Sequence, residues 1–146
     1  PRCREVLDQI KQLGVKLAVD DFGKGYTSLN QLRSLPLDTL KIDRSLVMEM
    51  FTHRSALLTG VIGMARALGI TVLAEGIETE EQCQFLAGSH CDLGQGYFLG
   101  IPLPASHFLD LFAESERSSG SHSRFRLLAA PEDPLSNIKR FRTPRT

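Results

Sequence analysis

The sequence lacks an excess of charge, a set of paired cysteines and a long apolar run, and each absence excludes a class of protein. Its 146 residues carry 17 basic and 17 acidic side chains, so no net field favours a nucleic-acid polymer or an anionic membrane. No apolar run is long enough to span a bilayer, and no signal peptide is visible. The three cysteines have no CxxC spacing, which indicates idle or buried thiols, not a disulfide framework or a zinc site.

Several catalytic motifs are also missing. The four histidines show neither HExxH nor HxH spacing, which is more typical of surface or capping residues than of metal ligands. The chain contains no GxSxG elbow, no Walker loop and no GxGxxG motif. It begins at Pro1 without an initiator methionine, inside an apparent helix, and we therefore expect a piece of a longer protein.

Strands alternate with helices along residues 1–113. Apolar spacing predicts a first helix over residues 5–13, followed by four β–α units. The predicted strands cover residues 15–19, 37–42, 70–74 and 91–97. The predicted helices cover residues 29–35 (capped by Thr27 or Ser28), 45–68 (broken near Thr52), 80–87 (with a capping box of Thr79 and Gln82) and 106–113.

This alternation predicts an α/β fold with parallel strands and right-handed crossovers. Both an open doubly wound sheet and a β/α barrel satisfy it, and four units are about half of a barrel of ~250 residues. The polar residues favour the half-barrel, because they stand at or near the ends of successive strands, where barrel enzymes build their sites. These residues are Asp20, Asp21, Lys41, Glu75 and Gln95.

The composition changes after residue 113. Residues 114–123 are rich in serine and glycine, which predicts a linker. Residues 124–146 are basic, contain proline and lack periodicity, which predicts a flexible tail. We favour a solvated terminus over a nucleic-acid or membrane contact, because the segment shows no amphipathic helix or aromatic ladder.

The stretch VKLAVDDFGKGYTSL, residues 15–29, places two carboxylates at the end of the first predicted strand. Neighbouring strand residues point to opposite faces, so Asp20 and Asp21 reach one site only if the chain turns there, which Gly23 and Gly25 permit. Two such carboxylates suit a hard divalent cation. The alternative is that Asp21 starts a turn and Asp20 caps the next segment.

The strand ends suggest a phosphodiester hydrolase. Asp20, Asp21 and Glu75 would hold one or two divalent ions, the arrangement that activates water and stabilises phosphoryl charge. Lys41 would be a fixed cation near the phosphate or water, and Gln95 would orient one of them. The alternatives are a solvent-facing Lys41, a helix N-terminal Glu75 and a Gln95 that only satisfies backbone groups.

Four segments, in order, resemble the C-terminal half of the EAL domain, the bacterial cyclic di-GMP phosphodiesterase family. They are DDFGKGYTSL, LPLDTLKIDRSLV, VLAEGIETEEQ and CDLGQGYFLGIPLP, and the resemblance covers residues 14–112. It implies the C-terminal half of a TIM-like (β/α)8 barrel that hydrolyses cyclic di-GMP to pGpG with Mg²⁺ or Mn²⁺. It also implies a cytoplasmic location, in a parent protein that can still be tethered to a membrane.

The resemblance assigns roles to the same residues. Asp20 and Asp21 match metal-binding aspartates, Lys41 the lysine at the catalytic water, Glu75 a metal ligand or general base, and Gln95 a glutamine near the site. The family's Glu-Ala-Leu segment is absent from the chain.

Two positions depart from the family pattern. Lys24 stands where the family usually has a small hydroxyl residue, so its charge could weaken metal binding or pair with a carboxylate. Ile101 stands where a basic residue often precedes proline, which puts a distal contact in doubt.

Two further hypotheses stay open. The domain could be an inactive EAL-type receptor for cyclic di-GMP or a protein-interaction module. If the chain is the complete polypeptide, we expect it to be inactive and to fold only by closing on a second copy or on a partner half-barrel, because half a barrel exposes sheet edges.

Overall fold

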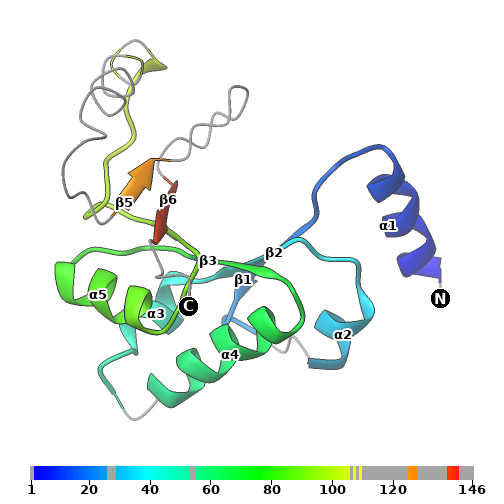
Figure 1. Cartoon of the computed structure of the whole chain (residues 1–146), viewed down its shortest axis with the longest axis horizontal. Coiled ribbons are helices and arrows are strands. Elements are labelled where there is room, and N and C mark those ends of the chain that lie inside the picture. The colour runs from blue at the N-terminus through cyan, green and yellow to red at the C-terminus, as the bar shows by residue number, and fades with distance from the viewer. Residues whose placement is uncertain are drawn as a thin grey trace.

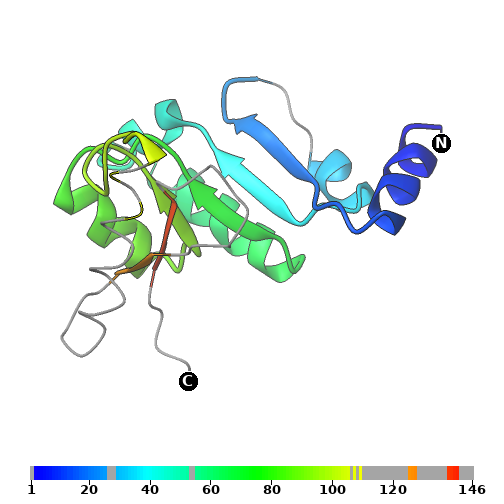
Figure 2. The ribbon, with the colours of Figure 1, turned by 90° about the horizontal axis from the view of Figure 1, so that it is seen from above.

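Four parallel strands form the centre of the molecule (Figure 1). The computed structural model describes residues 2–25, 29–52, 55–105, 107, 109, 125–127 and 138–141. Each strand pairs in parallel with the next along the chain, and Figure 2 shows the first three side by side. They are β1 (Ala18–Phe22), β2 (Thr39–Ile42), β3 (Thr71–Ala74) and β4 (Leu93–Gln95). The α/β class with four parallel strands is therefore confirmed, whereas the helix of the fourth predicted β–α unit lies largely outside the described residues.

Helices precede and connect these strands. They are α1 (Arg2–Gln12), α2 (Leu29–Ser34), α3 (Arg44–Met48), α4 (Ser55–Ala67) and α5 (Glu80–Gly88). The predicted break in the long helical segment is present, since α3 ends at Met48 and α4 begins at Ser55. The predicted capping box of Thr79 and Gln82 is also present at the start of α5. In the part of the chain that the structure describes, no helix has the length and apolar character needed to cross a bilayer.

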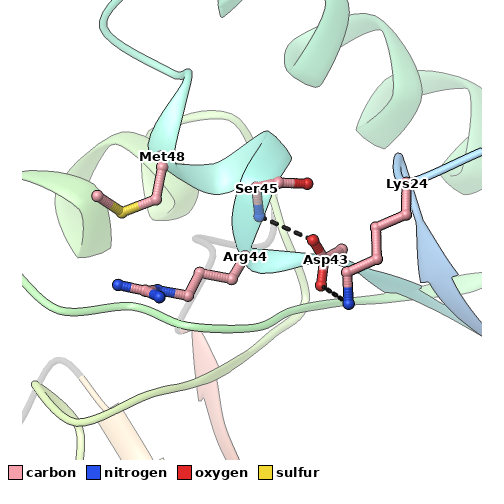
Figure 3. A pocket seen from close by; sticks show the side chains of 5 residues that line it. All are labelled: Lys24, Asp43, Arg44, Ser45 and Met48. Atoms are coloured by element: carbon pink, nitrogen blue, oxygen red, sulfur yellow. Dashed lines mark hydrogen bonds and ion pairs between the residues drawn. The ribbon is translucent and has the colours of Figure 1, made fainter.

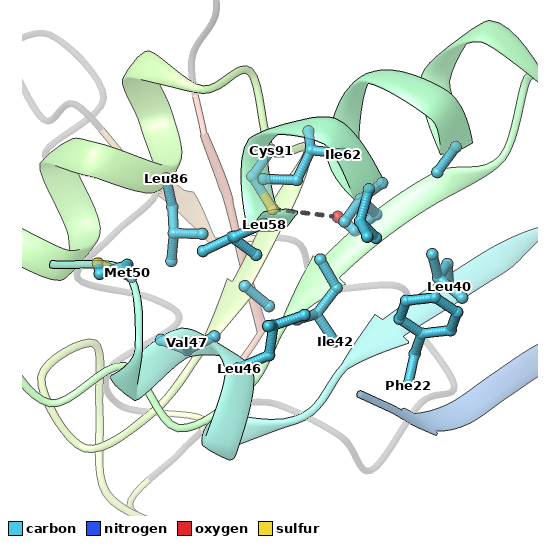
Figure 4. Close-up of a cluster of buried hydrophobic side chains, with 14 of the residues drawn as sticks. Phe22, Leu40, Ile42, Leu46, Val47, Met50, Leu58, Ile62, Leu86 and Cys91 are labelled. Carbon is cyan, nitrogen blue, oxygen red and sulfur yellow. Dashed lines mark hydrogen bonds between the residues drawn. The ribbon is translucent and has the colours of Figure 1, made fainter. Parts of the chain in front are cut away.

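One face of the sheet carries the hydrophobic core (Figure 4). Leu40 and Ile42 of β2 are fully buried and pack with side chains of α4 and α5, among them Leu58, Ile62 and Leu86. Alternate strand residues point to opposite faces, so this packing directs Lys41 to the face that the helices do not cover. The core thus fixes the orientation of the lysine at the candidate site.

Strand β1 lies later in the chain than predicted. The alternation of residues 15–19 predicted the strand there, but the structure places it at Ala18–Phe22, so Asp20 and Asp21 belong to the strand itself. Among the described strands β1 is at one end of the sheet, and Val15 is half-exposed. An edge strand buries little, and its apolar pattern therefore marks its position poorly.

Two short strands lie within the predicted basic tail. β5 (Phe125–Leu127) and β6 (Ile138–Phe141) are antiparallel to each other, and β6 is antiparallel to β4. These seven residues therefore join the sheet, whereas the tail was predicted from a lack of periodicity. The predicted linker at residues 114–123, the capping residues Thr27 and Ser28, and most of the predicted helix at 106–113 lie outside the described residues. The domain boundaries stay a prediction.

Candidate functional site

Lys41 joins carboxylates from two neighbouring segments. Its Nζ lies 2.9 Å from Oδ1 of Asp20 in β1 and 2.7 Å from Oε1 of Glu75, directly after β3. The N–H of Glu75 donates to the carbonyl of Ile42 at 3.0 Å, which continues the β2–β3 ladder and fixes Glu75 beside β2. Parallel strands end at the same edge of the sheet, and this register brings the three side chains together.

Charge pairing sets the protonation states of this group. Burial alone would lower the pKa of Lys41, but hydrogen bonds to Glu75 and Asp20 outweigh burial and raise it. The hydrogen bond from Lys41 lowers the pKa of Asp20, against a smaller opposing effect of burial. Only 23% of the Lys41 side chain is exposed, so it is not the solvent-facing charge of the alternative interpretation. At neutral pH the group is an ammonium held by a carboxylate on each side.

Asp21 is turned toward a different lysine. Its φ of 55° lies in the left-handed region, and the pairing of β1 with β2 is irregular between Val19 and Phe22. The turn expected at the two aspartates is thus present, but the two carboxylates pair with different lysines, Asp20 with Lys41 and Asp21 with Lys24. Oδ1 of Asp21 accepts from Nζ of Lys24 at 2.7 Å, and the N–H of Asp21 donates to Oδ1 of Asp20 at 2.9 Å.

Asp43 is a buried carboxylate that the sequence reasoning did not select. It caps the N-terminus of α3 by accepting from the N–H of Ser45, and it pairs with Nζ of Lys24 at 2.9 Å (Figure 3). Burial alone would raise the pKa of Asp43, but the hydrogen bonds from Ser45 and Lys24 outweigh burial and lower it. The available signal was the preference for aspartate immediately before a helix.

A shallow hollow of about 380 Å³ adjoins the aspartate turn. It is lined by Lys24, Asp43, Arg44, Ser45 and Met48 (Figure 3). Lys24 is the residue that the hollow shares with the aspartate turn, whereas Lys41 and Glu75 do not line it. The charged group around Lys41 is therefore the better candidate for chemistry than the hollow.

Gln95 lies at the end of β4, one strand beyond Glu75. Its carbonyl accepts from the N–H of Ile77 at 3.0 Å, which holds the loop after β3 against the end of β4. Among the described residues, no hydrogen bond joins the Gln95 side chain to Lys41 or Glu75. The structure thus places Gln95 at the expected edge of the sheet without linking it directly to the charged group.

The candidate ligands have the right chemistry for a hard divalent cation, but in the described part of the chain too few of them lie close together to hold one. Asp20, Asp21 and Glu75 offer carboxylate oxygens, the ligands that Mg²⁺ and Mn²⁺ prefer. Within the described residues, however, no three His, Cys, Asp or Glu side chains gather closely enough to hold a metal ion. Lys41 and Lys24 neutralise these carboxylates instead. A bound metal would therefore need further oxygen donors and a rearrangement of these ion pairs.

Two predicted alternatives do not match the geometry. Glu75 lies five positions before α5, which begins at Glu80, so it is not a carboxylate of the helix's first turn. Asp20 lies inside β1 and pairs with Lys41, so it is not the cap of the next helix.

Known proteins resemble this chain over the same region. The family model of the EAL domain matches residues 1–102. The cyclic di-GMP phosphodiesterase NbdA of Pseudomonas aeruginosa is 46% identical over 101 residues, which are 68% of this chain and 13% of NbdA. The chain therefore spans only about an eighth of that relative's length.

Solved structures agree with the sequence match. The PaMucR phosphodiesterase in complex with c-di-GMP is 39% identical, with a TM-score of 0.66 over 71% of this chain and 43% of that one. A calcium and cyclic di-GMP complex of BlrP1 from Klebsiella pneumoniae is 38% identical, with a TM-score of 0.61 over 66% of this chain and 25% of that one. On the family match and these likenesses, the chain belongs to the EAL domain family.

Proposed function

We propose that the intact protein containing this chain is a cyclic di-GMP phosphodiesterase that requires Mg²⁺ or Mn²⁺. The observation that carries the proposal is the ion-paired group of Asp20, Lys41 and Glu75 at the carboxyl edge of the sheet in an EAL domain. The reaction adds one water across one phosphodiester bond of the cyclic dinucleotide, so that a P–O bond breaks and linear pGpG forms.

Lys41 acts as a hydrogen-bond donor in this proposal. Its raised pKa keeps it protonated, so it cannot remove a proton from water and instead stabilises negative charge on the phosphate or positions the attacking water. Glu75 is the partner that accepts: its carboxylate takes the proton of that water or binds the metal. Gln95 orients substrate or water from the end of β4.

Asp20, Asp21 and Glu75 would hold the divalent ion. When bound, the ion polarises the phosphoryl oxygen and lowers the pKa of water. The BlrP1 complex, which contains calcium with cyclic di-GMP, supports a divalent ion in this family. Mg²⁺ keeps several waters and binds phosphate oxygens, so substrate and solvent would supply part of the coordination shell.

The proposal extends to where the domain acts and to how its barrel is completed. We propose a cytoplasmic location, because cyclic di-GMP is a messenger inside the cell, and the parent protein can still be tethered to a membrane. We also propose that a partner half-barrel or a second copy of the chain supplies the elements that close the barrel.

One observation favours a second candidate function, a non-catalytic receptor for cyclic di-GMP. In the described residues each candidate ligand carboxylate pairs with a lysine, and no metal-binding cluster is assembled. A receptor would keep the fold and the phosphate-binding charge of Lys41 without the metal.

The experiment uses the longest natural polypeptide that contains this sequence. It is incubated with cyclic di-GMP and Mg²⁺ or Mn²⁺, and linear dinucleotide is measured by chromatography. We expect turnover that falls at least 100-fold in Glu75→Gln and in Asp20→Asn, as for loss of a general base or of a charge-stabilising group.

Glu80→Gln is the matched control, because Glu80 is an exposed glutamate on α5 and its loss should leave turnover unchanged. Saturable cyclic di-GMP binding without product, with either metal, would contradict the enzymatic proposal and support the receptor.

A further inference from the structure

Lys24 bridges two carboxylates that differ greatly in exposure. Its Nζ lies 2.7 Å from Oδ1 of Asp21 and 2.9 Å from Oδ2 of Asp43. The side chain of Asp21 is 60% exposed, whereas that of Asp43 is 8% exposed. The lysine therefore links a candidate metal ligand to a buried anchor.

Of the two ion pairs of Lys24, the one with buried Asp43 is the harder to break. Asp43 also accepts from the N–H of Ser45 at 2.9 Å as the cap of α3, and its own N–H donates to the carbonyl of Phe22 at 3.0 Å. A buried carboxylate that lost its cationic partner would keep an uncompensated charge, which is costly. An exposed carboxylate such as Asp21 exchanges its partner for water or an ion at little cost.

We propose that Lys24 is a tethered counter-cation that competes with the divalent metal for Asp21 and thereby lowers the affinity of the site for metal. This inference rests on the metal site of the proposed function. In the metal-free protein the ammonium neutralises Asp21 and holds its carboxylate at a cation that Asp43 shares. For Asp21 to serve as a metal ligand it would have to leave the ammonium, and Lys24 would then stay paired with Asp43.

The positive charge of Lys24 would repel the metal ion even after Asp21 had left the lysine. An ammonium fixed on Asp43 remains close to the aspartate turn, and unit charges about 4 Å apart in water interact strongly enough to change a binding constant roughly fivefold. A divalent ion experiences twice that repulsion at equal distance, partly cancelled by the Asp43 carboxylate. The effect must decline with added salt, because the site is exposed.

The test is a titration with Mn²⁺ in which electron paramagnetic resonance counts the free ion, performed on the longest natural polypeptide that contains the chain. Lys24→Gln removes the charge at similar side-chain length, and we expect Mn²⁺ to bind roughly fivefold more tightly at low salt. Lys24→Arg keeps the charge and should retain the affinity of the unaltered protein to within about twofold. The gain in Lys24→Gln should shrink in about 0.5 M salt.

Lys16→Gln is the matched control, because it removes the same charge from an exposed lysine before β1, at the opposite end from the aspartate turn. Circular dichroism confirms that each variant is folded. Equal Mn²⁺ affinity in Lys24→Gln and the unaltered protein would overturn the inference and leave the proposed metal site intact. Absence of Mn²⁺ binding in every folded variant would overturn the metal site and, with it, this role of Lys24.

Discussion

At the residue scale, Asp38 is an ion-paired carboxylate outside the candidate site. It accepts hydrogen bonds from Nζ of Lys11 in α1 and from the N–H of Leu17 before β1. These two bonds lower the pKa of Asp38 from its ordinary value of 3.8, and the bond from Lys11 has the larger effect. Asp38 thus connects α1 and β1 to the start of β2.

This pairing predicts a pH-dependent contribution to stability. A carboxylate with a lowered pKa in the folded state stabilises the fold above pH about 4, and the contribution is lost as the pH falls through its folded pKa. In urea unfolding at pH 7, Asp38→Asn should lower the free energy of unfolding by about 1 kcal/mol. The difference between the two proteins should shrink toward pH 2.

Asp8→Asn is the control, because Asp8 forms an exposed pair with Arg4 at 3.7 Å, and such pairs contribute little. A deficit in Asp38→Asn that stayed constant with pH would show that the side-chain charge does not matter.

Gly96 is a second residue whose role follows from contacts. A Cβ at this position would lie 2.1 Å from the carbonyl oxygen of Ile77 and 2.2 Å from its nitrogen. Backbone atoms cannot move aside as a flexible side chain can, so Gly96→Ala should separate the loop after β3 from β4. We expect a loss of about 2–3 kcal/mol in the free energy of unfolding, measured by chemical denaturation.

Gly60 provides the matched glycine. It lies in α4, and a Cβ there would meet no atom within 4 Å. Alanine favours a helix interior, so Gly60→Ala should raise the free energy of unfolding by about 0.5–1 kcal/mol. The opposite signs of two Gly→Ala changes follow from the contacts alone, and equal effects would refute this interpretation.

At the element scale, α5 is the helix with the fullest set of local start signals. Thr79 accepts from the N–H of Gln82 at 3.3 Å, while the Gln82 side chain accepts from the N–H groups of Thr79 and Glu78. Thr79→Ala removes the hydroxyl acceptor and should lower the free energy of unfolding by about 1 kcal/mol. Thermal or urea unfolding measures this change.

Thr59→Ala is the comparison within another helix. Thr59 is exposed inside α4, where alanine has the better helix propensity, so its replacement should leave stability unchanged or slightly higher. A similar loss in both variants would mean that the capping box of α5 contributes nothing specific.

These elements also show how much the sequence could predict. The capping box of α5 was visible because its signal is local, and β2 and β3 were placed closely because their buried residues fix the pattern. The predicted position of β1 was wrong by three residues, because a strand at the end of the described sheet has fewer buried residues to mark its position. Strand register predicted that Lys41 and Glu75 would converge, which they do.

The bridge from Lys24 to Asp43 could not be predicted from the sequence. It depends on the path of the turn after Asp21 and on where α3 lies against that turn. Asp43 signals where α3 begins in the sequence, but not where the helix lies in space. For the same reason, the sequence did not predict that Asp21 pairs with Lys24 while Asp20 pairs with Lys41. Sequence pattern located the charged edge, whereas the exact pairing within it required coordinates.

At the scale of the whole molecule, one end of the sheet is open within the described part of the chain. β4 pairs with β6 on its far side, whereas β1 pairs only with β2 among the described strands. Figures 1 and 2 place α1 at the same end as β1. Val6 and Leu13, two of the apolar residues whose spacing predicted this helix, are 51% and 80% exposed. This end of the described structure therefore offers both exposed apolar side chains on α1 and a strand edge on β1 that no described strand covers.

This open end predicts self-association. Unpaired backbone groups on an edge strand recruit another strand, and exposed apolar side chains add a favourable burial term. Size-exclusion chromatography with light scattering should give at least a dimer for the 146-residue chain.

Ala18→Lys places a charge on the exposed β1 edge and should shift the mass to the monomer, because lysine blunts edge pairing. Ala56→Lys adds the same charge to the exposed surface of α4 and should leave the assembly unchanged. A well-folded monomer of the unaltered chain would refute the prediction, because the four parallel strands and their helices would then be stable with this edge unpaired.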